Sequence, residues 1–247
     1  MSPSKQNERE AKQGRERLRL YQARQEVHVT QVKRRKRDNW VAAIVVVVFL
    51  GIAILGQWAF FDHSAPAQSK SLSLPSPTLA GNRTWSGTLT INTIPLGIEL
   101  DGKQAPQAVS STIYLAQKKF YDGLSCHRLT TSGIYVLQCG DPTGTGNGGP
   151  GYTYGPIENA PADNVYPAGT IAMARESNNA KSQGSQFFIV YKTSTIPSDT
   201  AGGYTVIGRV TSHLDTLISQ VTDKGVQGGT TDGKPAVTTT IGQFRLQ

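Results

Sequence analysis

The sequence predicts a mainly β domain, a closed eight-stranded antiparallel barrel capped by two helices, preceded by a single transmembrane helix. Three observations lead to this prediction. Short β-type runs recur from about residue 85 to the C-terminus, separated by Gly, Pro and Asp. Only two stretches of the same region have the apolar spacing of an amphipathic helix. Upstream of them, residues 40–61 form a 22-residue run without formal charge.

The charge of the chain is concentrated at its N-terminus. The 247 residues have a net charge of +8, and residues 1–39 contain 12 basic and 5 acidic side chains. The remaining residues are nearly neutral, which excludes a globally basic nucleic-acid-binding domain. We therefore expect no nucleic-acid partner. Residues 1–39 are interpreted as a basic cytoplasmic tail, either solvated or in contact with anionic lipid.

Residues 40–61 are predicted to span a membrane. As a helix they would extend roughly 33 Å, enough for a hydrocarbon core of about 30 Å. Five basic residues at 33–37 precede them, which favours a cytoplasmic N-terminus and an extracytoplasmic C-terminal domain. A cleavable signal peptide is the alternative, but the run is long for one and follows a 39-residue leader. We expect a single-pass protein of the cell membrane.

Residues 62–84 are rich in Ser, Pro and Ala and read as a linker to a domain at 85–247. In that domain, alternating apolar residues at 96, 98 and 100 predict a strand. A helix is expected to start at Pro106, and a second one near Ser212, where Ser212 and Asp215 resemble a capping box. Further strands are expected at 125–129, 134–139, 169–174, 186–191, 204–210 and 236–246.

Several motifs fail as functional sites. Residues 144–149 match GxGxxG, but Pro150 follows, so no helix N-terminus is available for a pyrophosphate. The four histidines lack metal-ligand spacing. We therefore expect neither a metal nor a cofactor.

The two cysteines, Cys126 and Cys139, flank the predicted hairpin. Outside the cytoplasm a disulfide is chemically allowed. Strand alternation opposes it, because Cys126 would share a face with Arg128 and Gln138 while Cys139 points the other way. A bulge would remove this objection, so the sequence leaves the pairing open.

One constellation points to chemistry. Arg128 and Gln138 lie on the hairpin, and Gln186 and Phe188 share one face of a later strand. Together they offer a cation, two amides and aromatic surface, without a nucleophile or paired carboxylates. Such a site can bind and polarise an amide but has no evident means to cleave it.

These residues stand in blocks that resemble the cyclophilins, a class of peptidyl-prolyl isomerases, here in a bacterial membrane-anchored form. The resemblance covers residues 85–247. Its blocks are Cys126-His127-Arg128, Gln138-Cys139-Gly140-Asp141, a Gly-rich loop, Met173-Ala174-Arg175 and Gly184-Ser185-Gln186-Phe187-Phe188-Ile189. The family pattern has Gly where this chain has Cys139. The tryptophan by which the family binds cyclosporin has no counterpart here, so weak cyclosporin affinity is expected.

The resemblance implies a role for each matching residue. Arg128 corresponds to the catalytic arginine, and Gln138 to the glutamine that positions it. Ala174 and Arg175 correspond to an Ala-Asn pair whose backbone holds the residue before proline. The substrate-binding residues implied by position are Tyr135, Val136, Ala174, Arg175, Gln186, Phe188, Ile196 and Tyr204.

The predicted function is therefore peptidyl-prolyl cis-trans isomerisation that assists the folding of secreted or envelope proteins. Arg128 would stabilise the twisted prolyl amide. The alternative is a non-catalytic proline-peptide-binding or chaperone module tethered to the membrane. In either case we expect proline-containing polypeptides as partners and a monomeric protein.

Overall fold

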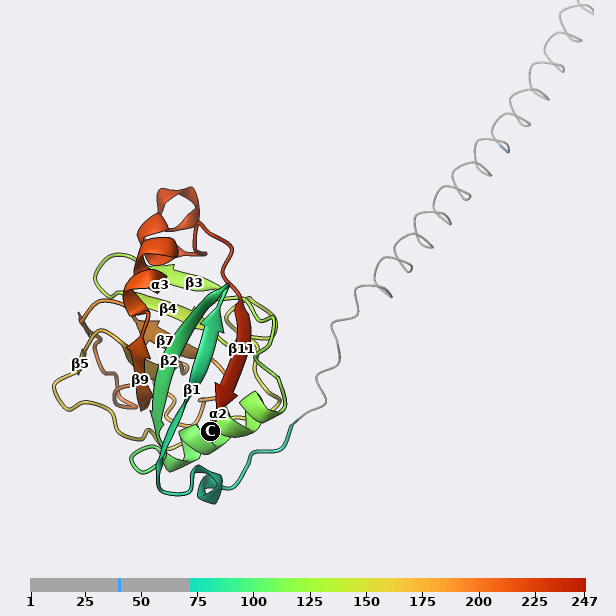
Figure 1. The fold of residues 1–247 in the computed structure, drawn as a ribbon, viewed down its shortest axis with the longest axis vertical. Helices are drawn as coiled ribbons and strands as arrows, with labels where there is room; N and C mark the ends of the chain where they lie inside the picture. Colours follow the sequence, from blue (N-terminus) through green and yellow to red (C-terminus); the bar gives the residue numbers. More distant parts are fainter. Residues whose placement is uncertain (1–39, 41–71) are drawn as a thin grey trace, which may run out of the picture. The chain divides into compact units, whose positions relative to one another are not determined.

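The computed structural model describes Trp40 and residues 72–247, and the latter form a curled, antiparallel nine-stranded sheet with two α-helices (Figure 1). The strand order is β10-β3-β4-β7-β6-β9-β2-β1-β11. Its strands are β1 (Thr84–Ile91), β2 (Ile94–Asp101), β3 (Arg128–Thr130), β4 (Val136–Cys139), β6 (Thr170–Met173), β7 (Phe187–Val190), β9 (Val206–Ser212), β10 (Asp232–Gly233) and β11 (Ile241–Leu246). The mainly β class is confirmed.

The other elements are short, apart from helix α2. Strands β5 (Val165–Tyr166) and β8 (Ser194–Thr195) pair as a separate two-stranded sheet. The α-helices are α2 (Pro106–Gln117) and α3 (Leu214–Gln220), and 3₁₀ turns occupy η1 (Pro77–Ala80), η2 (Thr222–Lys224) and η3 (Gln227–Gly229). Figure 1 shows α2 at one end of the curled sheet and α3 at the other, so the two predicted helices are confirmed.

The predicted closed eight-stranded barrel needs correction, because the ladder of the described sheet ends at β10 on one side and β11 on the other. The gap is bridged by irregular backbone pairing instead. The Cys126 N–H donates to the Thr239 carbonyl at 2.8 Å, and the Ile241 N–H donates to the Leu124 carbonyl at 2.8 Å. Only one isolated bridge, Ser125 with Thr240, forms here, because the chain before β3 does not run as a regular strand.

Alternation along the central strands separates two apolar clusters. Leu137, Phe187 and Ile189 face the interior of the curled sheet and join the main core, which α2 covers at one end. Val136 and Phe188 face the other way and form a second cluster with Ala172, Tyr166, Val190 and Ile196. Because successive side chains of a strand alternate, the same four-residue strands serve both the core and the outer surface.

Helix α2 begins at Pro106, as predicted, with proline at its first position. Helix α3 begins at Leu214, but the predicted capping box is wrong. Ser212 belongs to β9, and its hydroxyl oxygen accepts a hydrogen bond from the Gly97 N–H at 3.2 Å. His213 takes the N-cap position in a left-handed conformation, without a side-chain cap bond. The cross-strand bond occupies the hydroxyl that the helix would have used.

Residues 72–84, which the sequence assigned to a linker, pack against the domain. The Ala80 N–H donates to the Ser110 hydroxyl at 2.9 Å, and that hydroxyl donates to the Pro77 carbonyl at 2.9 Å. The indole N–H of Trp85 donates to the Ala80 carbonyl at 2.8 Å. The packed chain therefore extends upstream of residue 85.

The predicted tail at 1–39, nearly all of the predicted span at 40–61 and the linker up to residue 71 lie outside the described residues. Within the part of the chain that is described, no helix has both the length and the apolar character needed to cross a bilayer.

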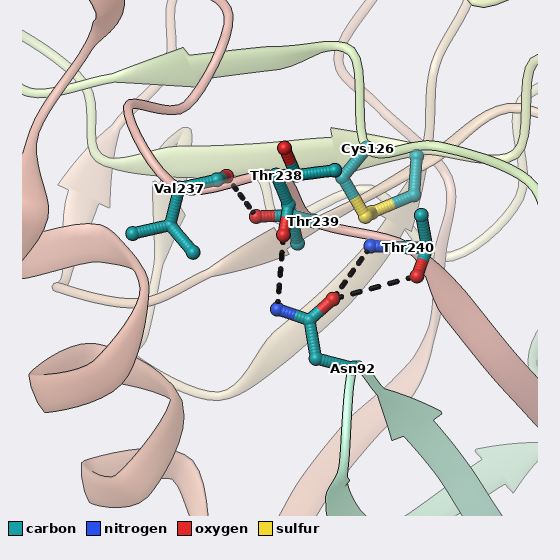
Figure 2. The surroundings of a disulfide bond; sticks show 7 residues. Asn92, Cys126, Val237, Thr238, Thr239 and Thr240 are labelled. Atoms are coloured by element: carbon teal, nitrogen blue, oxygen red, sulfur yellow. Dashed lines mark hydrogen bonds between the residues drawn. A yellow bond between two sulfur atoms is a disulfide. The ribbon is translucent and has the colours of Figure 1, made fainter.

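The two cysteines form a disulfide, with both residues buried (Figure 2). Arg128 pairs with Gln138 in the β3–β4 ladder, but Cys126 lies two residues before that ladder starts. Its N–H bonds to Thr239 rather than to β4, so strand alternation does not fix its direction. Asn92 holds the neighbouring segment through hydrogen bonds to Thr238 and Thr240.

Candidate active site

A pocket of about 620 Å³ opens on the outer face of strands β3, β4 and β7, and β10 also lines it. Of the residues predicted to form the site, it is lined by Arg128, Val136, Gln138, Ala174, Arg175, Phe188, Ile196 and Tyr204. Its apolar floor comes from the second cluster, in which the ring of Tyr204 meets Phe188 edge-to-face with centroids 5.5 Å apart. The pocket therefore joins a cation and an amide to an apolar slot.

The register of the sheet sets up a chain of polar side chains along the pocket. Arg128 pairs with Gln138, and Gln138 pairs with Phe188 on the next strand. Nη1 of Arg128 donates to Oε1 of Gln138 at 3.4 Å, and Nε2 of Gln138 donates to Oε1 of Gln186 at 2.9 Å. Each bond uses a different end of the Gln138 amide, so its orientation is fixed.

Gln186 connects this chain to the Gly-rich loop. Its Nε2 donates to the carbonyl oxygens of Gly146 and Gly148, both at 2.9 Å. Gln186 lies outside the main pocket and lines a neighbouring hollow of about 460 Å³, which Gln138 and Ala174 also line. Both glutamine amides are thus held by neighbours on either side.

Asp141 anchors the Gly-rich loop. Its buried carboxylate accepts hydrogen bonds from the backbone N–H groups of Thr143, Thr145 and Gly146, and from the Thr143 hydroxyl. Burial alone would raise the pKa of Asp141, but the donated bonds together lower it below its usual value. At Gly148 a Cβ would collide with the carboxylate. The carbonyls that receive Gln186 are therefore held in place by a buried charge.

Arg128 has a second partner that the sequence did not reveal. Its Nε and Nη2 donate to the two carboxylate oxygens of Asp232 in β10, each at 2.8 Å. These bonds raise the pKa of Arg128 and lower the pKa of Asp232, so both stay charged. Asp232 lies 104 residues further along the chain in a two-residue strand, where no apolar pattern marks it.

His127 also lines the pocket and was not predicted to do so. Both of its ring nitrogens are buried without a hydrogen-bond partner among the described residues. Burial lowers the pKa of His127, and the positive charge of Arg128 lowers it further against an opposing effect of Asp141. These effects favour the neutral imidazole, and Arg128 is the cation beside it.

Tyr135 is a correction, because it does not line the pocket. Its ring packs against Tyr191 with centroids 5.9 Å apart, and the Lys192 ammonium lies 4.4 Å from the ring centroid. Its neighbours Ile134 and Val136 line the pocket instead, since alternate residues of an extended segment face the same side. Other lining residues that sequence reasoning missed are Thr145, Gly146, Ser177, Gly233 and Lys234.

The arrangement suits binding of an uncharged peptide amide beside an apolar ring. The Gln138 amide and the Arg128 guanidinium line the pocket, the Gln186 amide lies in the neighbouring hollow, and the floor is apolar. Among the residues that the structure describes, no group of three or more His, Cys, Asp or Glu side chains is placed to hold a metal ion.

Comparison with known proteins assigns this geometry to a family. A family model described as cyclophilin type peptidyl-prolyl cis-trans isomerase/CLD matches residues 88–244. The chain belongs to the cyclophilin family. The matched region contains strands β2 to β10, parts of β1 and β11, and every residue that lines the pocket.

Two mycobacterial proteins are similar in sequence, both described as probable peptidyl-prolyl cis-trans isomerase B. The Mycobacterium tuberculosis protein is 41% identical over 167 residues, which cover 63% of this chain and 52% of that protein. The Mycobacterium leprae protein is 34% identical over 197 residues, covering 73% of this chain and 65% of that one. The chain thus matches about half to two thirds of the length of these relatives.

A solved cyclophilin has a similar fold. It is a Cryptosporidium parvum cyclophilin type peptidyl-prolyl cis-trans isomerase, crystallised in the presence of the dipeptide Ala-Pro. Its sequence identity is 26% and its TM-score 0.52, and the match covers 65% of this chain and 96% of that one.

Proposed function

We propose that this cyclophilin catalyses cis-trans isomerisation of peptide bonds that precede proline, in secreted or envelope proteins. The observation that carries the proposal is the position of Arg128 and Gln138 beside a slot floored by Phe188, in one pocket of about 620 Å³. Family membership and the related structure obtained with Ala-Pro support the substrate class.

The chemical task is rotation about a bond with partial double-bond character. The barrier is about 18–20 kcal/mol, and uncatalysed exchange takes about 10–100 s. Reaching milliseconds requires a factor of about 10⁴, or roughly 5.5 kcal/mol. Twisting the bond localises a lone pair on the prolyl nitrogen. A guanidinium aimed at that nitrogen stabilises the twisted state more than the planar one, as catalysis demands.

Arg128 alone does not supply this energy. One hydrogen bond to a charged group contributes about 1.5–3 kcal/mol. The apolar floor formed by Val136, Phe188 and Ile196 contributes by removing water from the amide and gripping the proline ring. Gln138 and Gln186, oriented by their mutual hydrogen bond, hold the acyl side. The reaction requires no cofactor.

The test compares the full chain with an Arg128→Ala variant on an Ala-Pro peptide, with kcat/KM measured by NMR exchange or by a coupled assay. Loss of one charge-assisted bond should reduce kcat/KM about 10- to 150-fold. Arg209→Ala is the matched control, because Arg209 forms an exposed ion pair with Glu99 away from the pocket. Equal rates for the parent and Arg128→Ala would contradict the proposal.

A non-catalytic proline-peptide-binding module remains the alternative outcome of this experiment. It would bind the Ala-Pro peptide without accelerating exchange, and Arg128→Ala would change only the affinity. One observation favours this alternative. Nε and Nη2 of Arg128 both donate to the Asp232 carboxylate, and this ion pair partly neutralises the charge of the guanidinium.

The membrane location is part of the proposal and rests on sequence. The uncharged run at 40–61 and the basic cluster at 33–37 support a single span with the domain outside the cytoplasm. The protein should stay in the membrane fraction after alkaline carbonate extraction. Protease added to spheroplasts, in which the cytoplasmic membrane is still closed, should cleave the C-terminal domain. Release by carbonate would contradict the anchor.

A further inference from the structure

We propose that the Arg175 side chain is a positioning residue that fixes Tyr204 against the pocket and so sets the width of the proline slot. The inference rests on the proposed function and deepens it. By resemblance, only the backbone at Arg175 was expected to meet substrate. In the structure the Arg175 side chain contacts Tyr204, which lines the pocket.

The Arg175 guanidinium is buried, with 1% of its side chain exposed. All five of its N–H groups have acceptors. Nε donates to the Gly203 carbonyl at 3.0 Å, and Nη1 to the Glu176 carbonyl at 2.9 Å. The remaining bonds from Nη1 and Nη2 reach the two carboxylate oxygens of Asp199, each at 2.8 Å, and the Gly202 carbonyl at 2.6 Å. No donor is left over for a substrate.

Asp199 extends the same network on the other side. Its oxygens also accept the N–H groups of Asn178 and Ala201, both at 2.8 Å. The bonds from Arg175, and then those from the backbone, hold the pKa of Asp199 well below its usual value. Asn178 in turn accepts a hydrogen bond from the Thr200 hydroxyl at 2.7 Å. The segments 175–178 and 199–203 are therefore joined as one unit, which we call the Arg175 clamp.

The Arg175 clamp ends at Tyr204. Gly202 and Gly203, whose carbonyls it holds, immediately precede this residue, and Gly202 has a φ of +107° that favours glycine. The Arg175 guanidinium carbon lies 4.7 Å from the centre of the Tyr204 ring. That ring packs edge-to-face on Phe188 at 5.5 Å. One side chain thus holds both the backbone before Tyr204 and one face of its ring.

The loop that is clamped connects two walls of the pocket. Ile196 and Tyr204 both line it, and the sequence between them is Pro-Ser-Asp-Thr-Ala-Gly-Gly. Without an anchor, two adjacent glycines would allow many backbone conformations. Lysine could not replace Arg175, because an ammonium has three donors and cannot form the paired bonds to a carboxylate. The position of Tyr204 therefore depends on a planar, five-donor group.

The test uses the full chain, with kcat and KM measured separately on an Ala-Pro peptide. Arg175→Lys should raise KM about tenfold while kcat changes less than about twofold, because the bonds among Arg128, Gln138 and Gln186 remain. Asp199→Asn should act in the same direction and keeps the size of the side chain, so it tests the clamp if Arg175→Lys does not fold. Arg209→Lys, which alters an exposed ion pair, is the matched control.

A double-mutant cycle separates positioning from general loss of structure. If Arg175 acts through Tyr204, Arg175→Lys should have no further effect on KM in a Tyr204→Ala background. Additive effects in the double variant, or an unchanged KM in both single variants, would overturn the inference.

A binding measurement separates this inference from the proposed function. If the parent binds the Ala-Pro peptide without accelerating exchange, the proposed isomerase fails, and the clamp is tested by a tenfold rise in Kd for Arg175→Lys. An unchanged Kd would then overturn the clamp. If the parent neither binds nor turns over the peptide, both proposals fail.

Discussion

At the residue scale, Asp232 sets the direction of the Arg128 guanidinium. The two side chains are 40% and 53% exposed, so their ion pair contributes little stability, about 0–1 kcal/mol. Its importance lies in geometry, because it occupies the Nε and Nη2 edge and leaves Nη1 directed toward Gln138.

We predict that Asp232→Asn lowers kcat/KM by about three- to tenfold, because a guanidinium that must be reoriented during the reaction stabilises the twisted amide less well. The free energy of unfolding should change by less than about 1 kcal/mol. Urea unfolding and peptide exchange by NMR measure the two effects. A large loss of stability with unchanged kcat/KM would assign Asp232 a purely structural role.

The carboxylate of Asp141 makes a pH-dependent contribution to stability. Since its folded-state pKa lies below the unfolded value, its contribution is present above the unfolded pKa of about 3.9 and is lost as the pH falls through the folded value. Asp141→Asn should cost about 1–3 kcal/mol at pH 7, because the NH2 group that replaces one carboxylate oxygen cannot accept the two N–H bonds that this oxygen accepts.

The difference in unfolding free energy between parent and Asp141→Asn should therefore shrink as the pH is lowered below about 4. Urea denaturation at a series of pH values measures it. A difference that stays constant from neutral pH to pH 3 would mean that the loop does not depend on the charge of Asp141.

At the scale of elements, the alternation of side chains made the faces of the central strands predictable. The residues just outside these strands were harder to place. Gln186 and Phe188 could be placed on one face because a regular strand has a period of two residues, and the resemblance joined them with Arg128 and Gln138 in one site. Tyr135 was misplaced because the resemblance assigned it to the pocket although it lies between two pocket residues, Ile134 and Val136.

Other features depend on contacts between distant segments, which a single sequence does not encode locally. Ser212 had the local pattern of a helix cap, but the cross-strand Gly97 N–H took its hydroxyl. Asp232 meets Arg128 only because β10 pairs with β3. The direction of Cys126 could not be predicted because its backbone bonds to Thr239 instead of continuing the hairpin.

The disulfide closes the hairpin that carries both Arg128 and Gln138, with a sequence separation of 13 residues. Replacing Cys126 and Cys139 together by serine should lower the free energy of unfolding by about 2–4 kcal/mol, through the larger entropy of the open unfolded chain. Urea unfolding of the oxidised parent and of the double variant measures this loss.

Dithiothreitol provides a second measurement, since it should destabilise the parent and leave the double variant unchanged. Equal unfolding midpoints for the oxidised parent and the variant would show that the neighbouring hydrogen bonds of Asn92 suffice to hold the hairpin.

At the scale of the whole molecule, Trp85 lies outside the pocket. Trp85 stands in β1, where it bonds to Ala80 and stacks under Arg83, whose guanidinium carbon lies 3.8 Å from the ring centre. The resemblance to cyclophilins implies a cyclosporin-binding tryptophan, and among residues 72–247 no tryptophan lines this pocket.

Cyclosporin should therefore inhibit this protein only weakly. We expect its inhibition constant to lie at least about 10-fold above that of a cyclophilin that has the tryptophan, which corresponds to roughly 1.4 kcal/mol of lost contact. Titration of peptide exchange with the drug measures it, with a tryptophan-containing cyclophilin assayed alongside. Potent inhibition at stoichiometric drug would contradict the prediction.

The extent of the folding unit is the remaining property of the whole molecule. Residues 72–84 bury Ala80 completely and satisfy the Ser110 hydroxyl and the Trp85 indole N–H. A fragment that starts at Trp85 would lose these three hydrogen bonds and the burial of Ala80, and each intramolecular hydrogen bond contributes about 0.5–1.5 kcal/mol.

A fragment of residues 85–247 should therefore unfold with a free energy at least about 2 kcal/mol below that of residues 72–247. Urea unfolding of the two fragments measures the difference. Ser110→Ala in the longer fragment is the matched control, and it should reproduce only part of the loss because Trp85 keeps its bond to Ala80. Equal urea unfolding midpoints for the two fragments would mean that residues 72–84 are a linker, because packing that adds no stability does not make them part of the folding unit.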